Sequence, residues 1–515
     1  MRINDHPADK PAFAMLGSGV EVTYGELNQA SNQGAHLFRD RGITPGDGIA
    51  IWLPNHAEFL KITWAAQRSG IYYTPISTFF QTEEVTYILE NSDASLLITN
   101  PELLKRLPAE FLEQTKLDIL LLDTLLLNKT SRDLKRQDSP DYPDWAAERR
   151  QYPTTPISDE CEGAEMIYSS GTTGRPKGVR FPLAFAPLGT VSQLFKTRIK
   201  MHALGSDTRY LSTAPMYHSA PLRYNMMVTR LGGTAFILEK FDAEAALEAI
   251  QQYRITHSQW VPTMFVRMLK LGAEKRTQYD VSSLRYAIHA AAPCPADIKQ
   301  QMIDWFGPII YEYYSGTEAN GSTAINSEEW LSHRGSVGRA IHGEVHILDD
   351  EGKEVPALES GTVYFANGSE FSYYKDEVKT AAAKNALGWS TLGDIGFVDA
   401  EGYLYLQDRK SFMIISGGVN IYPQEVENLL ITHPRVSDVA VFGVPDDEFG
   451  EAVKAVVELM PGTASTPELA VELIMFCRAK LSHIKCPRTL DFLPKLPRHP
   501  TGKLYKQQLK DPYWP

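Results

Sequence analysis

The chain has 515 residues, of which 43% are hydrophobic and 22% are charged, and its formal net charge is -12 at pH 7. This length exceeds what a single hydrophobic core organises and predicts about three domains or subdomains. The negative charge disfavours nucleic acid and anionic lipid as general partners. The most apolar stretch, residues 119–127, is interrupted by Asp123, so we expect no integral membrane association.

The N-terminus and the cysteines favour a reducing, cytoplasmic setting. Residues 1–6 lack the apolar run of a signal peptide. The cysteines have neither metal-binding nor disulfide-framework spacing, which is typical of cytosolic proteins. The four cysteines are Cys161, Cys294, Cys477 and Cys486.

The sequence is also compatible with a homodimer.

Apolar and amphipathic stretches alternate from Phe13 to about Gly393, which predicts an α/β fold. Residues 48–54 are expected to form a strand, followed by a helix over residues 57–70. Residues 129–159 are rich in polar side chains and have neither a helical nor a strand period. We therefore interpret this segment as a loop region.

The most informative motif is residues 168–178, which read Tyr-Ser-Ser-Gly-Thr-Thr-Gly-Arg-Pro-Lys-Gly. Its glycines allow positive φ and close approach of a ligand, its hydroxyls can donate to phosphate oxygens, and its lysine adds a cation. The spacing differs from that of a P-loop, and the chain after it is expected to be extended, so no helix dipole receives the phosphate. A glycine-rich surface hairpin is the alternative. The expected phosphate contacts are Ser169, Ser170, Gly171, Thr172, Thr173, Gly174 and Lys177.

Four further features could contact a nucleotide. Tyr314 to Glu318 offers an aromatic face for adenine and a carboxylate for Mg²⁺. Asp394 follows a glycine-bearing turn, from which a carboxylate could reach ribose hydroxyls. Arg409 ends a predicted strand, and Lys503 stands on a Pro-Thr-Gly turn. Taken singly, each has an ordinary alternative as a turn, a surface ion pair or a solvated lysine.

A second unit begins after the Asp408-Arg409-Lys410-Ser411 segment. A strand at residues 412–415 is expected to lead into two glycines and then into a helix that starts at Pro423. The elements expected after it lie at residues 439–442, 452–459, 468–481 and 489–493. A segment of about a hundred residues is long enough for a separate α+β domain. We therefore place one domain at residues 1–410 and a second at residues 411–515.

In order and approximate spacing, these motifs are similar to the core motifs of the adenylate-forming superfamily, which comprises acyl-CoA synthetases, luciferases and adenylation domains. The resemblance covers nearly the whole chain. It implies a large N-terminal domain of α/β subdomains that binds AMP, and a small, mobile α+β C-terminal domain. Further matching segments lie at residues 23–27, 215–218, 290–293 and 416–423.

The resemblance implies an ATP-dependent acid:CoA ligase, which is an AMP-forming acid-thiol ligase. The carboxylate of a hydrophobic acid would attack the α-phosphate of ATP in the presence of Mg²⁺, with release of pyrophosphate. The acyl-adenylate would then pass to the thiol of coenzyme A. Such chemistry needs positive charge between two anions rather than a nucleophilic side chain. The implied partners are a small carboxylic acid, ATP and CoA.

The resemblance also implies roles for single residues. Thr317 would contact the α-phosphate and Glu318 the metal. Lys503 would bridge the carboxylate and the α-phosphate. His218 resembles a family residue near the carboxylate, and a core histidine is the alternative. The set implied to bind ATP, besides the phosphate loop, is Ala291, Ala292, Pro293, Tyr314, Thr317, Asp394, Arg409 and Lys503.

A hinge is implied at Lys410 and Ser411, about which the C-terminal domain would rotate to exchange Lys503 for a thiol tunnel. Gly417 and Gly418 would line that tunnel, because glycine leaves room for pantetheine; a plain β-turn is the alternative. Ser411 departs from the family pattern, in which aspartate or lysine is common. This departure puts an electrostatic latch at the hinge in doubt.

The acid is expected to have an apolar tail. The residues of the motifs are most similar to those of the fatty-acid branch of the superfamily. Aryl, phenylpropanoid or steroid-side-chain acids are the alternative substrates. Loading of a carrier protein by a stand-alone adenylation enzyme, and non-catalytic binding of ATP, are further alternatives. Ser315 stands where glycine is common and could tighten the pocket or only adjust a turn. The segments implied to line the pocket carry little charge and lie at residues 217–224, 260–265, 313–316 and 320–321.

Overall fold

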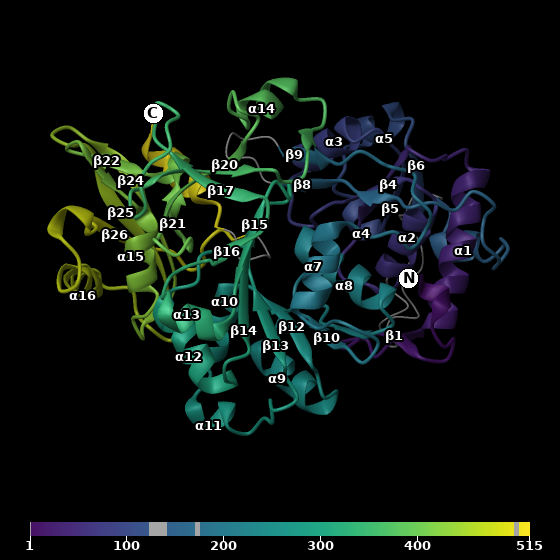
Figure 1. Cartoon of the computed structure of the whole chain (residues 1–515), viewed down its shortest axis with the longest axis horizontal. Helices are drawn as coiled ribbons and strands as arrows, with labels where there is room; N and C mark the ends of the chain where they lie inside the picture. The colour runs from purple at the N-terminus through teal and green to yellow at the C-terminus, as the bar shows by residue number, and fades with distance from the viewer. Residues whose placement is uncertain (1, 123–141, 170–175, 499–503, 515) are drawn as a thin grey trace. The chain divides into compact units, whose positions relative to one another are not determined.

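The computed structural model describes residues 2–122, 142–169, 176–498 and 504–514 (Figure 1). Its architecture is mixed α/β with an α+β portion at the C-terminal end, which confirms the predicted fold class. The chain divides into two compact units, and it passes between them several times. The first unit comprises Met1–Gln259, Gln278–Tyr286 and Glu370–Thr380; the second comprises Trp260–Thr277, Ala287–Ser369 and Ala381–Pro515.

A five-stranded parallel sheet with the order β6-β5-β3-β4-β7 lies in the first unit. Strands β3 and β4 are entirely buried, as is usual for parallel strands, which are covered on both faces. The strand and helix expected at residues 48–54 and 57–70 are confirmed as β3 and α2. The elements of this part are η1 (Ile3–Asp5), α1 (Tyr24–Asp40), β3 (Gly48–Trp52), α2 (Ala57–Arg68), β4 (Tyr72–Pro75), α3 (Thr82–Asn91), β5 (Ala94–Thr99), α4 (Pro101–Leu104), α5 (Ala109–Gln114), β6 (Asp118–Leu121) and β7 (Ala164–Glu165).

A short helix, α6 (Trp145–Arg149), lies inside the segment that we interpreted as a loop, so that interpretation is wrong at these residues. Asp144 caps the helix by accepting a hydrogen bond from the Ala147 amide at 2.8 Å. The Trp145 side chain is fully buried, and its indole donates to Oε2 of Glu58 at 3.0 Å. Tertiary burial of one tryptophan therefore sets this helix, and five residues are too few to show a period.

The first unit contains two further sheets. One has the order β2-β1-β11-β10-β12 and is parallel except at the β1–β2 pair; the other is antiparallel with the order β19-β9-β8. The elements are β1 (Pro11–Met15), β2 (Glu21–Thr23), β8 (Ile167–Ser169), β9 (Lys177–Arg180), α7 (Gln193–Met201), β10 (Arg209–Ser212), α8 (Ser219–Arg230), β11 (Thr234–Ile237), α9 (Ala243–Gln252), β12 (His257–Trp260), β19 (Ser372–Tyr373) and α14 (Glu377–Ala382).

In the second unit, β13 pairs with β14 in parallel, and β14, β15 and β16 continue in antiparallel order. A four-stranded antiparallel sheet, β17-β18-β20-β21, follows in the sequence. The elements are α10 (Pro262–Leu269), α11 (Ala273–Arg276), β13 (Tyr286–His289), α12 (Ala296–Phe306), β14 (Ile310–Ser315), β15 (Ser322–Ile325), α13 (Ser327–Ser332), β16 (Arg339–His342), β17 (Glu344–Leu348), β18 (Gly361–Ala366), β20 (Ser390–Val398) and β21 (Leu404–Arg409).

The C-terminal part of the second unit is a five-stranded sheet with helices on both faces. Alternate side chains of β24, such as Val439 and Val441, share one core with α15 and α16. The intervening Ala440 and Phe442 share a second core with Leu509 of α17. Period-two alternation thus explains both layers. The elements are η3 (Lys410–Phe412), β22 (Ile414–Ser416), β23 (Val419–Ile421), α15 (Pro423–Leu430), β24 (Val436–Asp446), β25 (Gly450–Leu459), α16 (Pro467–Arg478), η4 (His483–Lys485), β26 (Thr489–Phe492), α17 (Lys506–Lys510) and η5 (Asp511–Tyr513).

The start of this part differs from expectation. The strand expected at residues 412–415 begins only at Ile414, and a second strand, β23, precedes the helix. Gly417 and Gly418 form the two-residue turn of a β22–β23 hairpin, with φ angles of 55° and 77°. A hairpin turn with two positive φ angles favours glycine at both positions. The plain β-turn that we gave as the alternative to a tunnel lining therefore describes the backbone of Gly417 and Gly418.

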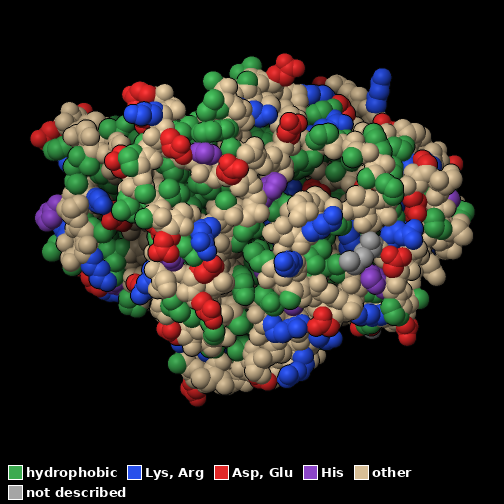
Figure 2. Space-filling model, viewed as in Figure 1, with side chains coloured by type: hydrophobic (Ala, Val, Ile, Leu, Met, Phe, Trp, Pro, Cys, Tyr) green, Lys and Arg blue, Asp and Glu red, His purple; other side chains and the backbone are tan. Residues whose placement is uncertain are grey.

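No helix of the described residues is both long and apolar enough to cross a lipid bilayer. On the face that Figure 2 shows, acidic and basic side chains are interspersed rather than gathered by sign.

Two buried histidines of the first unit should make the protein labile to acid. His202 and His257 are almost fully buried, and Nε2 of His257 lies 2.7 Å from the carbonyl oxygen of His202. Burial lowers the pKa of His202 from 6.5 to about 3 and that of His257 to about 4.

Folding lowers the pKa of both histidines, so the contribution of the neutral histidines to stability is complete above pH 6.5. This contribution is lost as the pH falls toward 4 for His257 and toward 3 for His202. We expect the free energy of unfolding to fall below pH 6.5 by up to about 1.4 kcal/mol per pH unit for each histidine. Urea denaturation at pH 7.5, 6 and 5 measures this slope, and the His202→Gln variant should reduce it. A flat profile between pH 6 and 5 would contradict the prediction.

Candidate functional site

The described ends of the phosphate-loop motif at residues 168–178 lie in two paired strands. Strands β8 and β9 are antiparallel, and Ser169 lies directly opposite Lys177. The extended chain expected after the loop is confirmed as β9. A Cβ on Gly178 would lie 2.7 Å from the Tyr168 ring, so this glycine is needed for packing. The other predicted loop contacts lie outside the described residues: Ser170, Gly171, Thr172, Thr173 and Gly174.

Tyr314, Asp394 and Arg409 converge in the second unit. Asp394 in β20 and Arg409 in β21 are register partners, and Nε of Arg409 donates to Oδ1 of Asp394 at 3.1 Å. The Tyr314 hydroxyl donates to Oδ2 of the same carboxylate at 2.5 Å. One carboxylate therefore joins the end of β14 to the sheet that contains β20 and β21. The turn expected before Asp394 is instead a kink within β20, where Gly393 has a φ of 79°.

Glu318 adds a second negative charge to this cluster. Its Oε2 lies only 2.7 Å from the position that a Cβ on Gly316 would take, so the carboxylate turns back over that glycine. Burial alone would lower the pKa of Arg409, but the charges of Asp394 and Glu318 and the Tyr314 phenol raise it. Burial and Asp394 together hold the pKa of Tyr314 well above its usual value. Arg409 is thus a firmly charged cation and Tyr314 a neutral donor.

The segment predicted to flank adenine follows β13. Ala291 and Pro293 are exposed, and Ala291 has a φ of 77°, a strained conformation for a residue with a Cβ. A buried ion pair lies next to the segment, because Nζ of Lys299 is 2.6 Å from Oε2 of Glu312. Glu312 is the register partner of His289, which immediately precedes the segment. This pair joins α12 to β14.

The stretch after Glu318 is held by polar contacts that the motifs do not reveal. Ser315 donates from Oγ to the carbonyl oxygen of Gly321 at 2.8 Å, so its hydroxyl braces a turn. Asn320 is fully buried and donates to Oγ of Ser390 at 3.1 Å. A Cβ on Gly321 would lie within 1.9 Å of the Phe365 ring, which leaves no room for another residue.

His218 belongs to the first unit, whereas Tyr314, Glu318 and Asp394 belong to the second. It precedes α8, and its ring meets Tyr217 edge-on at 4.6 Å. Asn55, which the sequence analysis missed, holds this stretch: it accepts from the Met216 amide at 2.7 Å and donates to the Leu238 carbonyl at 2.8 Å. A single asparagine after a strand belongs to no sequence pattern that indicates such a role.

The predicted hinge residues lie in η3, and Ser411 is exposed. Asp408 accepts hydrogen bonds from the amides of Arg409, at 2.7 Å, and Gln424, at 3.1 Å. A Cβ on Gly417 would lie 2.9 Å from the Phe449 ring, whereas one on Gly418 would meet nothing within 4 Å. Lys503 lies outside the described residues.

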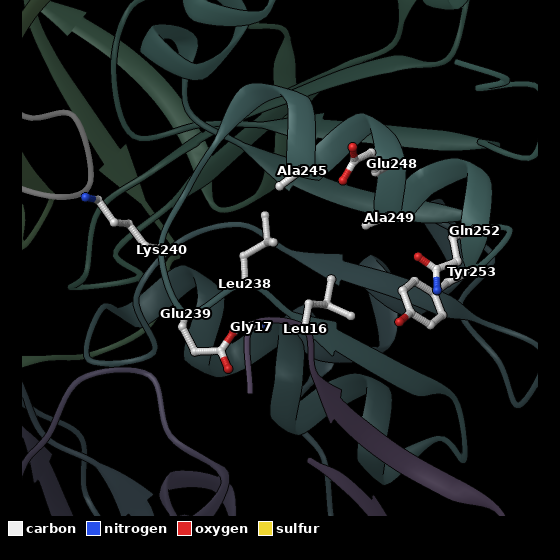
Figure 3. A pocket seen from close by; sticks show the side chains of 10 residues that line it. All are labelled: Leu16, Gly17, Leu238, Glu239, Lys240, Ala245, Glu248, Ala249, Gln252 and Tyr253. Carbon is white, nitrogen blue, oxygen red and sulfur yellow. Dashed lines mark hydrogen bonds between the residues drawn. The ribbon is translucent and has the colours of Figure 1, made fainter. Parts of the chain in front are cut away.

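A separate hollow of about 300 Å³ lies in the first unit, after the ends of β1 and β11. Figure 3 shows Glu239 beside Gly17, whose amide donates to Oε2 of that carboxylate at 2.6 Å. None of its lining residues was predicted as a site residue. In the ranges that the structure describes, no group of three or more His, Cys, Asp or Glu side chains could hold a metal ion. The hollow is lined by Leu16, Gly17, Leu238, Glu239, Lys240, Ala245, Glu248, Ala249, Gln252 and Tyr253.

Comparison with known proteins matches nearly the whole chain to the adenylate-forming enzymes that its motifs resemble. Residues 1–374 match the family model of the AMP-binding enzyme, and residues 425–503 match that of the AMP-binding enzyme C-terminal domain. A feruloyl-CoA synthase of Amycolatopsis sp is 32% identical over 97% of this chain and 95% of its own. The long-chain-fatty-acid--CoA ligase FadD13 of Mycobacterium tuberculosis is 29% identical over 98% and 95%.

Among solved structures, the o-succinylbenzoate CoA synthetase of Bacillus subtilis, in complex with its acyl-adenylate intermediate, superposes with a TM-score of 0.79. It is 26% identical, and the match covers 97% of this chain and 95% of that one. The chain therefore belongs to the AMP-binding enzyme family. Its activity is that of an ATP-dependent, AMP-forming acid:CoA ligase.

The Tyr314 hydrogen bond should stabilise the second unit measurably. A bond to a charged partner contributes about 1.5–3 kcal/mol, so Tyr314→Phe should lower the free energy of unfolding by about that amount. Ser315→Ala, on the same strand, removes only a neutral bond and should cost about 0.5–1.5 kcal/mol. Urea denaturation of both variants gives the comparison. Equal losses would show that the Asp394 charge does not strengthen its bond to Tyr314.

Proposed function

We propose that the Tyr314, Asp394 and Arg409 cluster holds the nucleoside part of ATP. The convergence of the Tyr314 and Arg409 side chains on the Asp394 carboxylate carries this proposal. Asp394 would accept hydrogen bonds from the ribose hydroxyls, and Arg409 would contact ribose or phosphate. Tyr314, together with residues Ala291 to Pro293, would flank adenine. The exposure of Ala291 and Pro293 supports this role, since a base needs accessible neighbours.

At the triphosphate, we propose that Ser169 to Lys177 bind the pyrophosphate end and that Thr317 contacts the α-phosphate. Glu318 fits a Mg²⁺ site made of one carboxylate and substrate oxygens, a common arrangement for this ion. Mg²⁺ bound there would offset the repulsion between the acid and the phosphate. Lys503 would place a second positive charge between the two anions, and His218 would lie near the acid carboxylate.

We also propose a division into domains at residues 1–410 and 411–515, with the hinge at Lys410 and Ser411. The separate hydrophobic core around α15 and α16 supports an independent C-terminal domain. Rotation about this hinge would have to break the bond between Asp408 and the Gln424 amide. After rotation, the hairpin turn at Gly417 and Gly418 would face the thiol of CoA.

The acid itself is proposed to be hydrophobic, in first place a fatty acid. The relationship to a long-chain-fatty-acid--CoA ligase supports this class. The relationship to a feruloyl-CoA synthase favours an aryl or phenylpropanoid acid as the second candidate. A pocket segment of low polarity suits both, because Trp260, Met264 and Phe265 are buried and uncharged.

Removal of Lys503 should separate the two half-reactions. Lys503→Ala is expected to slow exchange of labelled pyrophosphate into ATP by about 100- to 1,000-fold, as for loss of one transition-state donor. Thiolysis of a supplied acyl-adenylate by CoA should change little, because that step does not need the lysine. Lys495→Ala, in the same domain, serves as the matched control. Equal loss in both half-reactions would contradict the assignment.

A screen of acids tests the substrate class. With fatty acids of increasing length, kcat/KM for CoA-dependent pyrophosphate release should rise about fourfold per methylene until the pocket is filled, because each buried methylene contributes about 0.8 kcal/mol. Benzoate, cinnamate, ferulate and bile acids form the comparison set. A higher kcat/KM for ferulate or cinnamate than for any fatty acid would replace the fatty-acid proposal by the aryl one.

A further inference from the structure

The proposed contacts for the α-phosphate and the metal, Thr317 and Glu318, lie in the connection between β14 and β15. Ahead of this connection, the Tyr314 hydroxyl donates to the Asp394 carboxylate in β20 at 2.5 Å. A connection that is bonded at one end can still move at the other. The contacts that follow Glu318 therefore decide how well its carboxylate is placed.

Asn320 supplies a second contact with β20. Its side chain is fully buried, and Nδ2 donates to Oγ of Ser390 at 3.1 Å and to the carbonyl oxygen of the same residue at 3.4 Å. Ser390 is the first residue of β20 and precedes Asp394 on that strand by four positions. The stretch that contains Thr317 and Glu318 is therefore tied at both ends to the strand that carries the proposed ribose contact.

Packing around Asn320 leaves the end of the connection little room to move. A Cβ on Gly368 would lie 1.6 Å from the carbonyl oxygen of Asn320, and a Cβ on Gly321 would lie 1.9 Å from the Phe365 ring. Ser390 is itself the register partner of Phe365 in β18. The bond from Asn320 thus ends on a residue whose own strand is paired.

We propose that Asn320 is a positioning residue for the adenylation half-reaction, because its bond to Ser390 sets Thr317 and Glu318 relative to the ribose contact on β20. The inference rests on the proposed function, in which these two residues act at the phosphates. Phosphoryl-transfer catalysis depends on positioning and electrostatics, so a small displacement of such side chains should cost rate. Binding of the nucleoside part, which other residues perform, should remain.

The test removes the bond from either side and compares a rate with an affinity. Asn320→Leu keeps the approximate volume of the side chain, and Ser390→Ala removes only the accepting hydroxyl. With an acid that the enzyme activates, Ser390→Ala should lower kcat for exchange of labelled pyrophosphate into ATP about 2- to 10-fold, as for loss of a neutral hydrogen bond. Asn320→Leu should lower it further, up to about 100-fold. Kd for AMP, measured by calorimetry, should stay within about twofold of wild type in both variants.

Ser327→Ala is the matched control. This serine is also fully buried in the second unit, where its Oγ accepts from the Ile310 amide and donates to the Ile310 carbonyl, each at 2.9 Å. Ile310 begins β14, at the end of the strand away from Thr317 and Glu318. The control should therefore lower the midpoint of thermal unfolding without a change in kcat. An equal loss of kcat in the control and in the two test variants would overturn the inference.

A double-mutant cycle shows whether Asn320 and Ser390 act through their shared bond. Ser390→Ala should add little in the Asn320→Leu background, and Asn320→Ala replaces the leucine variant if that protein does not fold. Additive losses, a loss of AMP affinity as large as the loss of kcat, or an unchanged kcat in both single variants would each overturn the inference. An unchanged Kd for AMP in Asp394→Asn would instead overturn the proposed function.

Discussion

The bond between Asp394 and Arg409 is the interaction on which the candidate site depends. These residues face each other across β20 and β21, and the carboxylate also accepts from Tyr314 at the end of β14. One buried charge thus connects two sheets at the last strand before the predicted hinge. Because it sets the position of a tyrosine and an arginine together, loss of either contact would disturb the other.

The structure holds its cations in two different ways. Arg409 is paired with the carboxylate of Asp394, which fixes its geometry and keeps it charged. Lys177 and Arg180 lie over aromatic rings, which help to orient a cation. In a chain with a net charge of -12, a triphosphate must be bound by positive charge at particular residues.

Elements defined by local pattern could be predicted from the sequence. The buried strand β3, the helix α15 with its proline at the start, and the strand β9 were expected because apolar runs and turn residues act over short distances. Contacts between distant segments could not be predicted. Asn55 accepts a hydrogen bond from Met216, 161 residues further along the chain. Lys177 lies over the ring of Tyr373, which is also distant in the sequence, and no local period records either pairing.

Backbone strain gives a final constraint on the proposed nucleotide site. Ala291 and Ala319 both adopt positive φ angles, 77° and 48°, although each has a Cβ. Such conformations cost about 1–2 kcal/mol per residue and persist only where the surroundings over-determine them. Here the buried pair of Lys299 and Glu312 borders the first segment, and the Asn320 hydrogen bond anchors the second. Buried polar contacts thus lie near both strained residues of the proposed site, through the register of β13 with β14 for Ala291 and through the neighbouring Asn320 for Ala319.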